Sequence, residues 1–400
     1  MAVDNPRGAL FRVLEPNQRS RVTFVELFFD LVFVYAVTQI SHYLIGHFTP
    51  LGAAQTAALF LAVWWVWVYT AWVTNWLDPE KALVRGLLFA LMLAGLVLSM
   101  SIPRAFEDRG LWFAIAYAAM QVGRTAFWLT ATPPQRSAVR LNAARILSWL
   151  SASAVLWLLG GFADGSARMA LWGAALTLEY ISPAVRFWIP GLGGSTVDDW
   201  MVEGGHMAER CALFIIIALG ESIVVTGATL AELDWTGANI AAFAGAFVGT
   251  VAMWAVYFNR GAEAGSEVIS RSTQSGLMAR SAYTYLHMPI VAGIIVSAVS
   301  DEIVLKHPLG HADWNTAATT IGGPFVFLLG TILFKLRIRG FLQLSHGAGL
   351  LALIGLSWFA TELSPLVLSA LTSVLLAIVA LWETLSLRSK PEPHASATSA

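Results

Sequence analysis

Charged residues and cysteines are both scarce in this chain. Only 12% of its 400 residues are Asp, Glu, Lys or Arg, which is about half the share found in an average soluble protein. A soluble fold of this size could not cover the apolar side chains, which make up 57% of the chain. The single cysteine, Cys211, excludes an internal disulfide and any metal site built on paired cysteines. The composition therefore predicts an integral membrane protein.

Motifs of the common enzyme classes are also missing. There is no glycine-rich phosphate loop, no His-Glu-x-x-His zinc motif, no Gly-x-Ser-x-Gly elbow and no Cys-x-x-Cys-His haem motif. Residues 1–21 contain no short apolar core, so we expect no cleavable signal peptide and the first apolar helix should act as the insertion signal. We expect no enzyme activity, cofactor, metal or nucleic-acid partner. The expected surroundings are a lipid bilayer.

Long apolar stretches divide the chain into segments that can each form a membrane-spanning helix. About 20 mostly apolar residues are enough to cross a hydrocarbon core roughly 30 Å thick. Turn residues, mostly Pro and Gly, separate the segments. The twelve predicted spans are 22–45, 51–76, 82–102, 111–131, 141–163, 167–189, 206–229, 236–259, 277–300, 316–335, 342–361 and 363–387.

These spans fall into two halves on either side of a glycine-rich loop. The predicted fold class is thus an all-α integral membrane protein with about 12 transmembrane helices. The predicted parts are a cytoplasmic N-terminal segment (1–21), a first six-helix half (22–189), a central cytoplasmic loop (190–205), a second six-helix half (206–387) and a disordered cytoplasmic tail (388–400).

Lysine and arginine are distributed unevenly between the two predicted sides. If the N-terminus is cytoplasmic, only Arg104, Arg109, Arg168 and Lys306 fall on the outer side, and Arg124 lies within a span. The other 19 of the 24 basic residues then lie on the cytoplasmic side or at helix ends that face it. Because cytoplasmic loops carry the excess of basic residues, we expect both chain ends to be inside.

Landmark residues recur in the same order in the two halves. Matching pairs are Glu26 with Glu209, Asn75 with Asn259, and Glu179 with Glu383. Their sequence offsets of 183, 184 and 204 drift slowly rather than scatter, which favours a six-plus-six duplication. Because each half would contain an even number of spans, six, both halves would have the same orientation in the membrane. Transporters built from such parallel repeats bind their substrate between the halves, near the midplane.

Ionisable residues inside the spans are the strongest functional signal, because a charge at the bilayer centre costs at least about 2.5–3.5 kcal/mol. Glu26 and Asp30 lie four residues apart in the first span and share a helix face. Two carboxylates this close repel each other, so we expect one to be protonated or both to be paired with an arginine. They either engage an ion or form a structural ion pair that holds the first span to its neighbours.

The seventh span carries a second group of polar candidates: His206, Glu209, Arg210, Glu221 and Ser222. Arg210 and Glu221 are eleven residues apart, close to three helical turns, so they share a side of the helix at different depths. Near the midplane, Glu221 can carry a proton, bind a cation or pair with an arginine. It is the best single functional candidate, and a purely structural role is the alternative.

Further candidates lie in the fourth, sixth and ninth spans: Arg124, Glu179, Arg280 and His287. An arginine does not readily lose its proton, and we expect Arg124 to pair with Glu179 or Asp30. His287 is either a ligand or a hydrogen-bonded core residue. Together with the candidates of the first and seventh spans, these residues predict one shared polar centre.

Three motifs resemble signatures of the bacterial low temperature requirement protein A family. They are the run VTFVELFFDLVFV at 22–34, His206-x-x-Glu209-Arg210 with LGESI at 219–223, and the segment from Arg280 to His287-Met288-Pro289. The resemblance covers nearly the whole chain. It implies a multi-pass protein of the bacterial cytoplasmic membrane, from a family that is named for a growth requirement in the cold and has no settled biochemical activity. A fainter likeness links residues 29–33 to the first-helix motif of lysosomal potassium channels.

The leading functional hypothesis is a transporter or channel-like permease that uses buried carboxylates to engage protons or cations. One alternative is a membrane-embedded redox or lipid-acting enzyme, in which His206, His287 and His346 would be the candidate ligands of a b-type haem. A second alternative is a structural or sensory membrane protein needed in the cold. The substrate, the coupling ion and the oligomeric state do not follow from the sequence.

Overall fold

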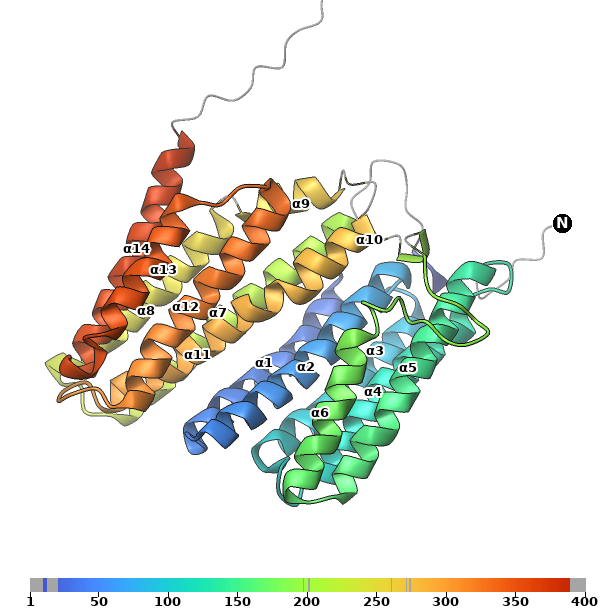
Figure 1. Ribbon diagram of the computed structural model, residues 1–400, viewed down its shortest axis with the longest axis horizontal. Coiled ribbons are helices and arrows are strands. Elements are labelled where there is room, and N and C mark those ends of the chain that lie inside the picture. The colour runs from blue at the N-terminus through green and yellow to red at the C-terminus, as the bar shows by residue number, and fades with distance from the viewer. Residues whose placement is uncertain are drawn as a thin grey trace, which may run out of the picture.

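The computed structural model describes residues 10–12, 21–196, 198–200, 202–259, 261–270, 272 and 275–388. Within these residues the chain is helical, with two isolated β-bridges and no strand (Figure 1). The helices are α1 (Phe24–Gly46), α2 (Pro50–Trp76), α3 (Ala82–Ser101), α4 (Gly110–Ala131), α5 (Ser137–Phe162), α6 (Gly165–Ile181), α7 (Gly204–Glu232), α8 (Gly237–Phe258), α9 (Gly261–Ser270), α10 (Ser275–Met278), α11 (His287–Lys306), α12 (Trp314–Arg339), α13 (Leu344–Ser357) and α14 (Pro365–Arg388). The predicted tail beyond Arg388 and most of the predicted segment 1–21 lie outside the described residues.

A helix occupies each of the twelve predicted ranges, in the predicted order. In the described part of the chain, nine helices are long and apolar enough to cross a membrane: α1, α2, α3, α5, α7, α8, α11, α12 and α14. The other three, α4, α6 and α13, are not among them, and α13 has only 14 residues. The chain is therefore a multi-pass helical membrane protein, and the full count of twelve crossings stays a prediction.

The sixth helix ends earlier than predicted, at Ile181 rather than at residue 189. Pro183 cannot continue the helix because it has no N–H to donate and its ring crowds the preceding turn. Arg186 and Phe187 then adopt positive φ angles of 57° and 48°, which turn the chain away from the helix axis. Pro183 and Arg186 mark this position in the sequence, but the apolar residues around them extended the predicted span to residue 189.

The ninth span also differs from its predicted range, 277–300. A π-helical stretch, η4 (Ala279–Tyr285), comes first and α11 begins at His287. Pro289 lacks the N–H that would bond the carbonyl of Tyr285 in a regular helix. A π-helical turn is a common way for a helix to absorb such an interruption, and such turns are frequent at functional sites.

The first six helices form one bundle, and α7, α8 and α11 to α14 form a second beside it (Figure 1). Contacts between the bundles come from α1 with α7 and α11 and from α2 with α7. Inside the first bundle α1 contacts α2 and α3, and α3 to α6 follow each other in contact; inside the second, α7 contacts α8 and α11, and α11 to α14 follow each other in the same way. The last helix of each half also contacts the second helix of that half. The two halves thus share one order of neighbours, and the duplication itself stays a prediction.

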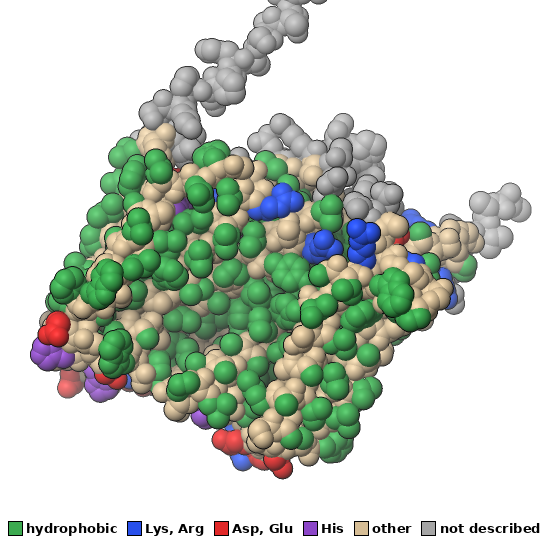
Figure 2. Space-filling model, in the orientation of Figure 1, with side chains coloured by type: hydrophobic (Ala, Val, Ile, Leu, Met, Phe, Trp, Pro, Cys, Tyr) green, Lys and Arg blue, Asp and Glu red, His purple; other side chains and the backbone are tan. Residues whose placement is uncertain are grey.

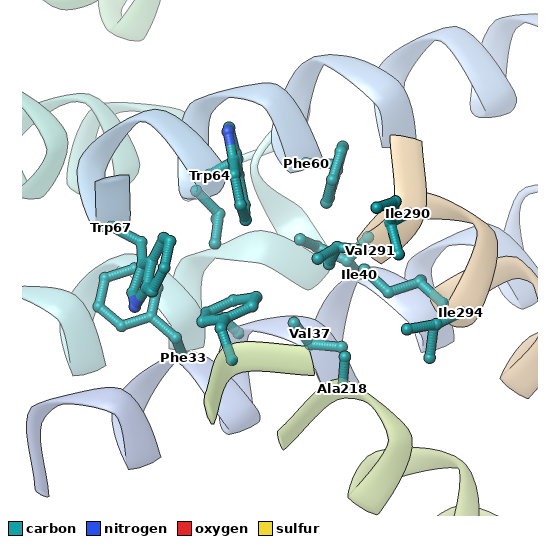
Figure 3. Close-up of a cluster of buried hydrophobic side chains, with 14 of the residues drawn as sticks. Phe33, Val37, Ile40, Phe60, Trp64, Trp67, Ala218, Ile290, Val291 and Ile294 are labelled. Atoms are coloured by element: carbon teal, nitrogen blue, oxygen red, sulfur yellow. The ribbon is translucent and has the colours of Figure 1, made fainter. Parts of the chain in front are cut away.

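An apolar layer fills the space between the two bundles (Figure 3). Its labelled members are Phe33, Val37, Ile40, Phe60, Trp64, Trp67, Ala218, Ile290, Val291 and Ile294. Trp64, Trp65 and Trp67 are at most 1% exposed, so this part of α2 packs between helices rather than against lipid. Because water is excluded from this layer, a charge that borders it must find its partner within the protein.

The outer surface is apolar over a broad band (Figure 2). Large apolar side chains such as Phe162 and Leu351 are 75% and 71% exposed, as they are in a protein surrounded by lipid. On the face shown, most of the visible Lys and Arg lie toward the upper edge, and Asp, Glu and His gather at the lower edge. This asymmetry is in keeping with the predicted orientation, with basic residues at the cytoplasmic side.

Glycines allow α11 and α12 to approach closely. A Cβ atom at Gly293 would lie 2.4 Å from the backbone nitrogen of Phe327, and one at Gly323 would lie 2.6 Å from that of Ser297. No residue with a side chain fits at these distances, and small residues are what membrane helices use for close contact. The approach brings the hydroxyls of Ser300 and Thr320 to 2.6 Å from each other.

Candidate functional site

A fully buried group of charges joins the first turns of α1 to those of α7. Asp30 Oδ1 accepts hydrogen bonds from Arg210 Nη2 at 2.7 Å and from Trp67 Nε1 at 2.8 Å. Arg210 Nη1 lies 3.2 Å from Glu26 Oε1. Glu26, Asp30 and Arg210 are all 0% exposed. We call Glu26, Asp30, His206 and Arg210, with Arg12, the interbundle cluster, because its ion pairs cross the boundary between the bundles.

Glu26 is held from several sides at the start of α1. His206 Nε2 lies 3.0 Å from its Oε1, and Arg12 Nη2 lies 3.0 Å from its Oε2. Thr23, the N-cap of α1, donates its backbone N–H and its hydroxyl to Oε2, each at 2.9 Å, which forms a capping box. With a neutral His206, two carboxylates face two guanidinium groups. The cluster then carries no net charge, which limits the cost of burying it.

Asn75 fixes the histidine of the cluster from the end of α2. Its Nδ2 donates to the Glu203 carbonyl at 2.9 Å and lies 3.3 Å from His206 Nδ1, and its Oδ1 accepts from the Glu203 N–H at 2.8 Å. The Glu203 side chain in turn caps α7 by accepting from the backbone N–H groups of Gly205 and His206. Sequence reasoning noted Asn75 only as a repeat landmark.

Glu209 lies apart from the cluster although it is next to Arg210 in the sequence. Its side chain is exposed, and its Oε2 accepts from the backbone N–H of Val22 at 3.3 Å. Neighbouring helical residues point about 100° apart, so only one of the two can face α1. Arg210 faces α1, and Glu209 is therefore not part of the buried cluster of charges.

Glu221 lies farther along the same boundary between the bundles. It is 3% exposed, and its Oε1 has no hydrogen-bond partner among the described residues. Thr38 and His42 of α1 and Glu302 of α11 are the nearby polar groups. Eleven residues separate Glu221 from Arg210, which corresponds to about 16 Å along α7. The apolar layer of Figure 3, which includes Ala218 of the same helix, borders the stretch between them.

Ser222 faces away from α1 and into the second bundle. Its hydroxyl donates to Asp301 Oδ2 at 3.0 Å and lies 3.2 Å from Thr250 Oγ1. Glu221 therefore faces the boundary between the bundles, whereas Ser222 faces the interior of the second bundle.

Glu179 is the centre of a separate cluster inside the first bundle. Its Oε2 accepts from Tyr117 Oη at 2.5 Å and Gln121 Nε2 at 3.2 Å, and its Oε1 accepts from Ser153 Oγ at 2.5 Å and Trp157 Nε1 at 3.1 Å. Four donors fill the acceptor positions of this carboxylate. Glu179 therefore ties α6 to α4 and α5.

The predicted partners of Arg124 are wrong. Arg124 donates to Gln121 Oε1 at 2.5 Å, to Thr70 Oγ1 at 3.1 Å and to the Val66 carbonyl at 3.2 Å, and it contacts neither Glu179 nor Asp30. Gln121, one turn earlier on α4, lies between Arg124 and Glu179 and bonds both. The two terminal nitrogens of the guanidinium thus bond neutral oxygens of α2 and α4, and its Nε has no hydrogen-bond partner among the described residues.

His287 and Arg280 are placed by local contacts. His287 Nε2 lies 2.7 Å from Tyr257 Oη and its Nδ1 lies 2.9 Å from the Ala282 carbonyl. Both ring nitrogens are engaged, as in a hydrogen-bonded core histidine. Arg280 donates to the Pro183 carbonyl at 2.9 Å. The predicted single polar centre is therefore divided into the interbundle cluster, the Glu179 cluster and these separate contacts.

A buried ion pair that sequence reasoning missed lies in the second bundle. Lys335 Nζ lies 2.8 and 2.7 Å from the two oxygens of Glu383, 2.8 Å from the Val256 carbonyl and 3.2 Å from His346 Nε2. Lys335 and Glu383 are each 3% exposed. Glu179 and Glu383 thus each tie the last helix of a half to its fourth and fifth helices. The repeat offset between the two glutamates was the only signal available in the sequence.

An aromatic cavity of about 30 Å³ lies between α2, α4, α5 and η4. Its walls include Trp65, Trp72, Trp76, Trp128 and Trp200, with Arg280 beside them. Trp65 and Trp128 are 0% and 2% exposed, and their indole N–H groups have no hydrogen-bond partner among the described residues. A buried donor without a partner marks a place where an acceptor oxygen would be bound favourably.

Comparison with known proteins identifies similar sequences over almost the whole chain. A family model described as Bacterial low temperature requirement A protein matches residues 21–381. The chain is 40% identical, over 377 residues, to an uncharacterized protein of Rhizobium meliloti (strain 1021), which covers 94% of this chain and 91% of that protein. No solved structure matches. The matched range contains every residue of the interbundle cluster except Arg12.

Proposed function

Because the chain belongs to the bacterial low temperature requirement A family, as its motifs indicated, we propose that this multi-pass membrane protein is a permease for protons or small cations. In this proposal the path lies between two six-helix halves of a duplicated, twelve-span bundle. Both chain ends face the cytoplasm, and the protein resides in the bacterial cytoplasmic membrane. The buried carboxylates of α1 and α7 engage the ion.

The observation that carries the proposal is the pairing of charges across the bundle boundary. Glu26 and Asp30 of α1 and Arg210 of α7 are fully buried and joined to each other. A buried ion pair adds little net stability over an apolar pair of the same size. Charges kept in a membrane protein despite that cost are functional candidates by default, and this position between two bundles is the one that transporters use.

The arrangement described here corresponds to a closed state. The interbundle cluster lies at one end of the boundary, Glu221 lies farther along it, and the apolar layer borders the stretch between them. A shift of one bundle against the other would separate Arg210 from Asp30 and leave the carboxylate ready to accept a cation or a proton. Such two-state rearrangement of packed bundles is how alternating access is achieved.

Ion flux in proteoliposomes tests this proposal. We expect Asp30→Asn and Glu221→Gln each to lower the flux of H⁺, Na⁺ or K⁺ down an imposed gradient by at least about tenfold, the factor that corresponds to 1.4 kcal/mol. Glu209→Gln is the matched control, because Glu209 is an exposed acid on the same helix. If correctly folded Asp30→Asn and Glu221→Gln proteins conduct as well as the unaltered protein, the site assignment is wrong.

The aromatic cavity favours a second candidate function, in which the protein acts on a flat, lipid-soluble ring such as a quinone. Stacked indole rings would hold the ring, and the indole N–H groups of Trp65 and Trp128 would donate to its oxygens. We expect a soluble quinone analogue to quench tryptophan fluorescence saturably, and Trp65→Phe to weaken this binding by roughly tenfold. Trp235→Phe, at a site that is 72% exposed, is the control. Quenching that rises linearly without saturation would exclude a specific site.

A further inference from the structure

A second cavity, inside the second bundle, has polar walls. It lies between α8, α11, α12 and α14, and its lining includes Ser297, Ser300, Asp301, Thr320, Thr372 and Ser373. The five hydroxyl side chains among these are only 3% to 7% exposed. We call it the hydroxyl cavity. The hydroxyls of Ser297 and Thr372 donate to carbonyls of their own helices, each at 2.9 Å. Their oxygen lone pairs therefore remain available to a cation in the cavity.

Asp301 is the charged group of this cavity. Its Oδ2 accepts from Ser222 Oγ at 3.0 Å, and no ion pair of Asp301 occurs among the described residues. An ionised carboxylate inside a membrane bundle is costly without a positive partner. A bound cation would supply that partner.

Thr320 can offer the cavity two oxygens. Pro324 lies inside α12 and, like Thr320, lines the cavity. Proline has no N–H, so the Thr320 carbonyl lacks the donor that residue 324 would provide in a regular helix. A carbonyl freed in this way is a common cation ligand in membrane proteins. The Thr320 hydroxyl lies 2.6 Å from that of Ser300, so the two are already ordered relative to each other.

We propose that the hydroxyl cavity binds one monovalent alkali cation, with Na⁺ as the best fit. Carboxylate, hydroxyl and carbonyl oxygens are hard ligands that suit hard cations. One carboxylate neutralises one positive charge, whereas a divalent ion would leave an excess charge in apolar surroundings. The cavity has a volume of about 20 Å³, and a single water molecule needs about 10–15 Å³. The cavity is therefore of the size for a single small ion.

This site is distinct from the path between the bundles. The hydroxyl cavity belongs to the second bundle, and Ser222 connects it to α7 beside Glu221. Binding is an equilibrium property of the folded protein and does not require that the protein conduct ions. The sodium site and the permease can therefore be refuted independently.

Thermal unfolding of the purified, detergent-solubilised full chain tests the proposal. We expect NaCl to raise the apparent unfolding temperature by roughly 2–4 °C relative to N-methylglucamine chloride at the same ionic strength, because a ligand that binds only the native state stabilises it. Asp301→Asn should abolish this difference. Glu302→Gln should keep it, since Glu302 is the next residue on α11 and pairs with Lys306 at 2.6 Å.

A second variant fills the cavity without changing its charge. Gly249 lines the cavity, and a Cβ atom there would lie 2.8 Å from Ser373 Oγ. Gly249→Ala should therefore reduce sodium stabilisation while Asp301 stays in place. Equal stabilisation by both salts in the unaltered protein, or a sodium effect that persists in Asp301→Asn and Gly249→Ala, overturns the proposal.

Direct binding of ²²Na⁺ to the unaltered protein tests the proposal even if the Asp301→Asn protein does not fold. We expect saturable binding of one ion per chain, weakened at least about tenfold by Thr372→Val or Ser373→Ala. Absent binding, or binding that neither variant alters, overturns the proposal. Sodium binding without flux in liposomes would refute only the permease, and flux without sodium binding would refute only this site.

Discussion

Replacing Arg210 by glutamine is expected to destabilise the protein by about 3–5 kcal/mol, the usual cost of removing one partner from a buried ion pair. Arg210 lies 2.7 Å from Asp30 and 3.2 Å from Glu26, and all three side chains are fully buried. Without the guanidinium, the buried Asp30 carboxylate would keep only the hydrogen bond from Trp67, whereas Glu26 would keep Arg12. Thermal unfolding in detergent and the monodisperse fraction after size-exclusion chromatography measure the loss.

Neutralising the carboxylates at the same time should restore much of this stability. The triple variant Glu26→Gln, Asp30→Asn, Arg210→Gln keeps the shapes and removes every uncompensated charge of these three groups. Arg210→Lys should fall between the two, because an ammonium cannot reproduce the two-pronged contact of a guanidinium. An Arg210→Gln protein that unfolds at the temperature of the unaltered chain would show that these ion pairs do not hold the bundles together.

Replacing Lys335 by methionine is the second change with a large expected effect, again about 3–5 kcal/mol. Lys335 is the cation closest to Glu383, with both oxygens within 2.8 Å of Nζ. Methionine matches the length of the stem and leaves the carboxylate buried among α8, α12 and α13. Unfolding temperature and expression level of the purified variant provide the measurement.

The double variant Lys335→Met, Glu383→Leu is the matched control for this pair. Exchanging a complete buried ion pair for apolar groups is often neutral or stabilising, so the double variant should unfold close to the unaltered protein. If it is as unstable as Lys335→Met alone, packing around Lys335 rather than the broken contact with Glu383 is responsible for the loss.

The sequence was sufficient for the helices and for four of the five members of the interbundle cluster, whereas Arg12, which precedes the first span, was not a candidate. Apolar runs punctuated by Pro and Gly placed helices in all twelve predicted ranges, because helix formation in lipid depends on length and composition alone. The four-residue spacing of Glu26 and Asp30 predicted a shared helix face and left two alternatives, protonation of one carboxylate or pairing of both with an arginine. The structure has the second arrangement, with Arg210 beside both. Which arginine pairs with them was beyond the sequence, since Arg124 and Arg210 are equally charged and only packing decides which helix lies against α1.

Other features depend on side chains that are individually ordinary. Ser297, Thr320 and Thr372 lie on three helices far apart in the sequence. From the sequence alone, each hydroxyl would be expected only to bond a carbonyl of its own helix. Lys335 was expected at a cytoplasmic helix end because it follows an apolar stretch, yet it is 3% exposed. Its burial results from α13 and α14 packing against α12, an arrangement that local patterns do not encode.

The ion pairs of the interbundle cluster also bear on how the protein is made. Glu26 and Asp30 leave the ribosome about 180 residues before Arg210, and chains are made at about 5–20 residues per second. For roughly ten seconds or more, Asp30 therefore lacks the cation that pairs with it in the finished protein, whereas Arg12, the partner of Glu26, is already present. During that interval the first helix must keep Asp30 protonated, remain near the insertion machinery or keep to the membrane interface. We therefore expect the first helix to reach its final buried position only after the seventh has been made.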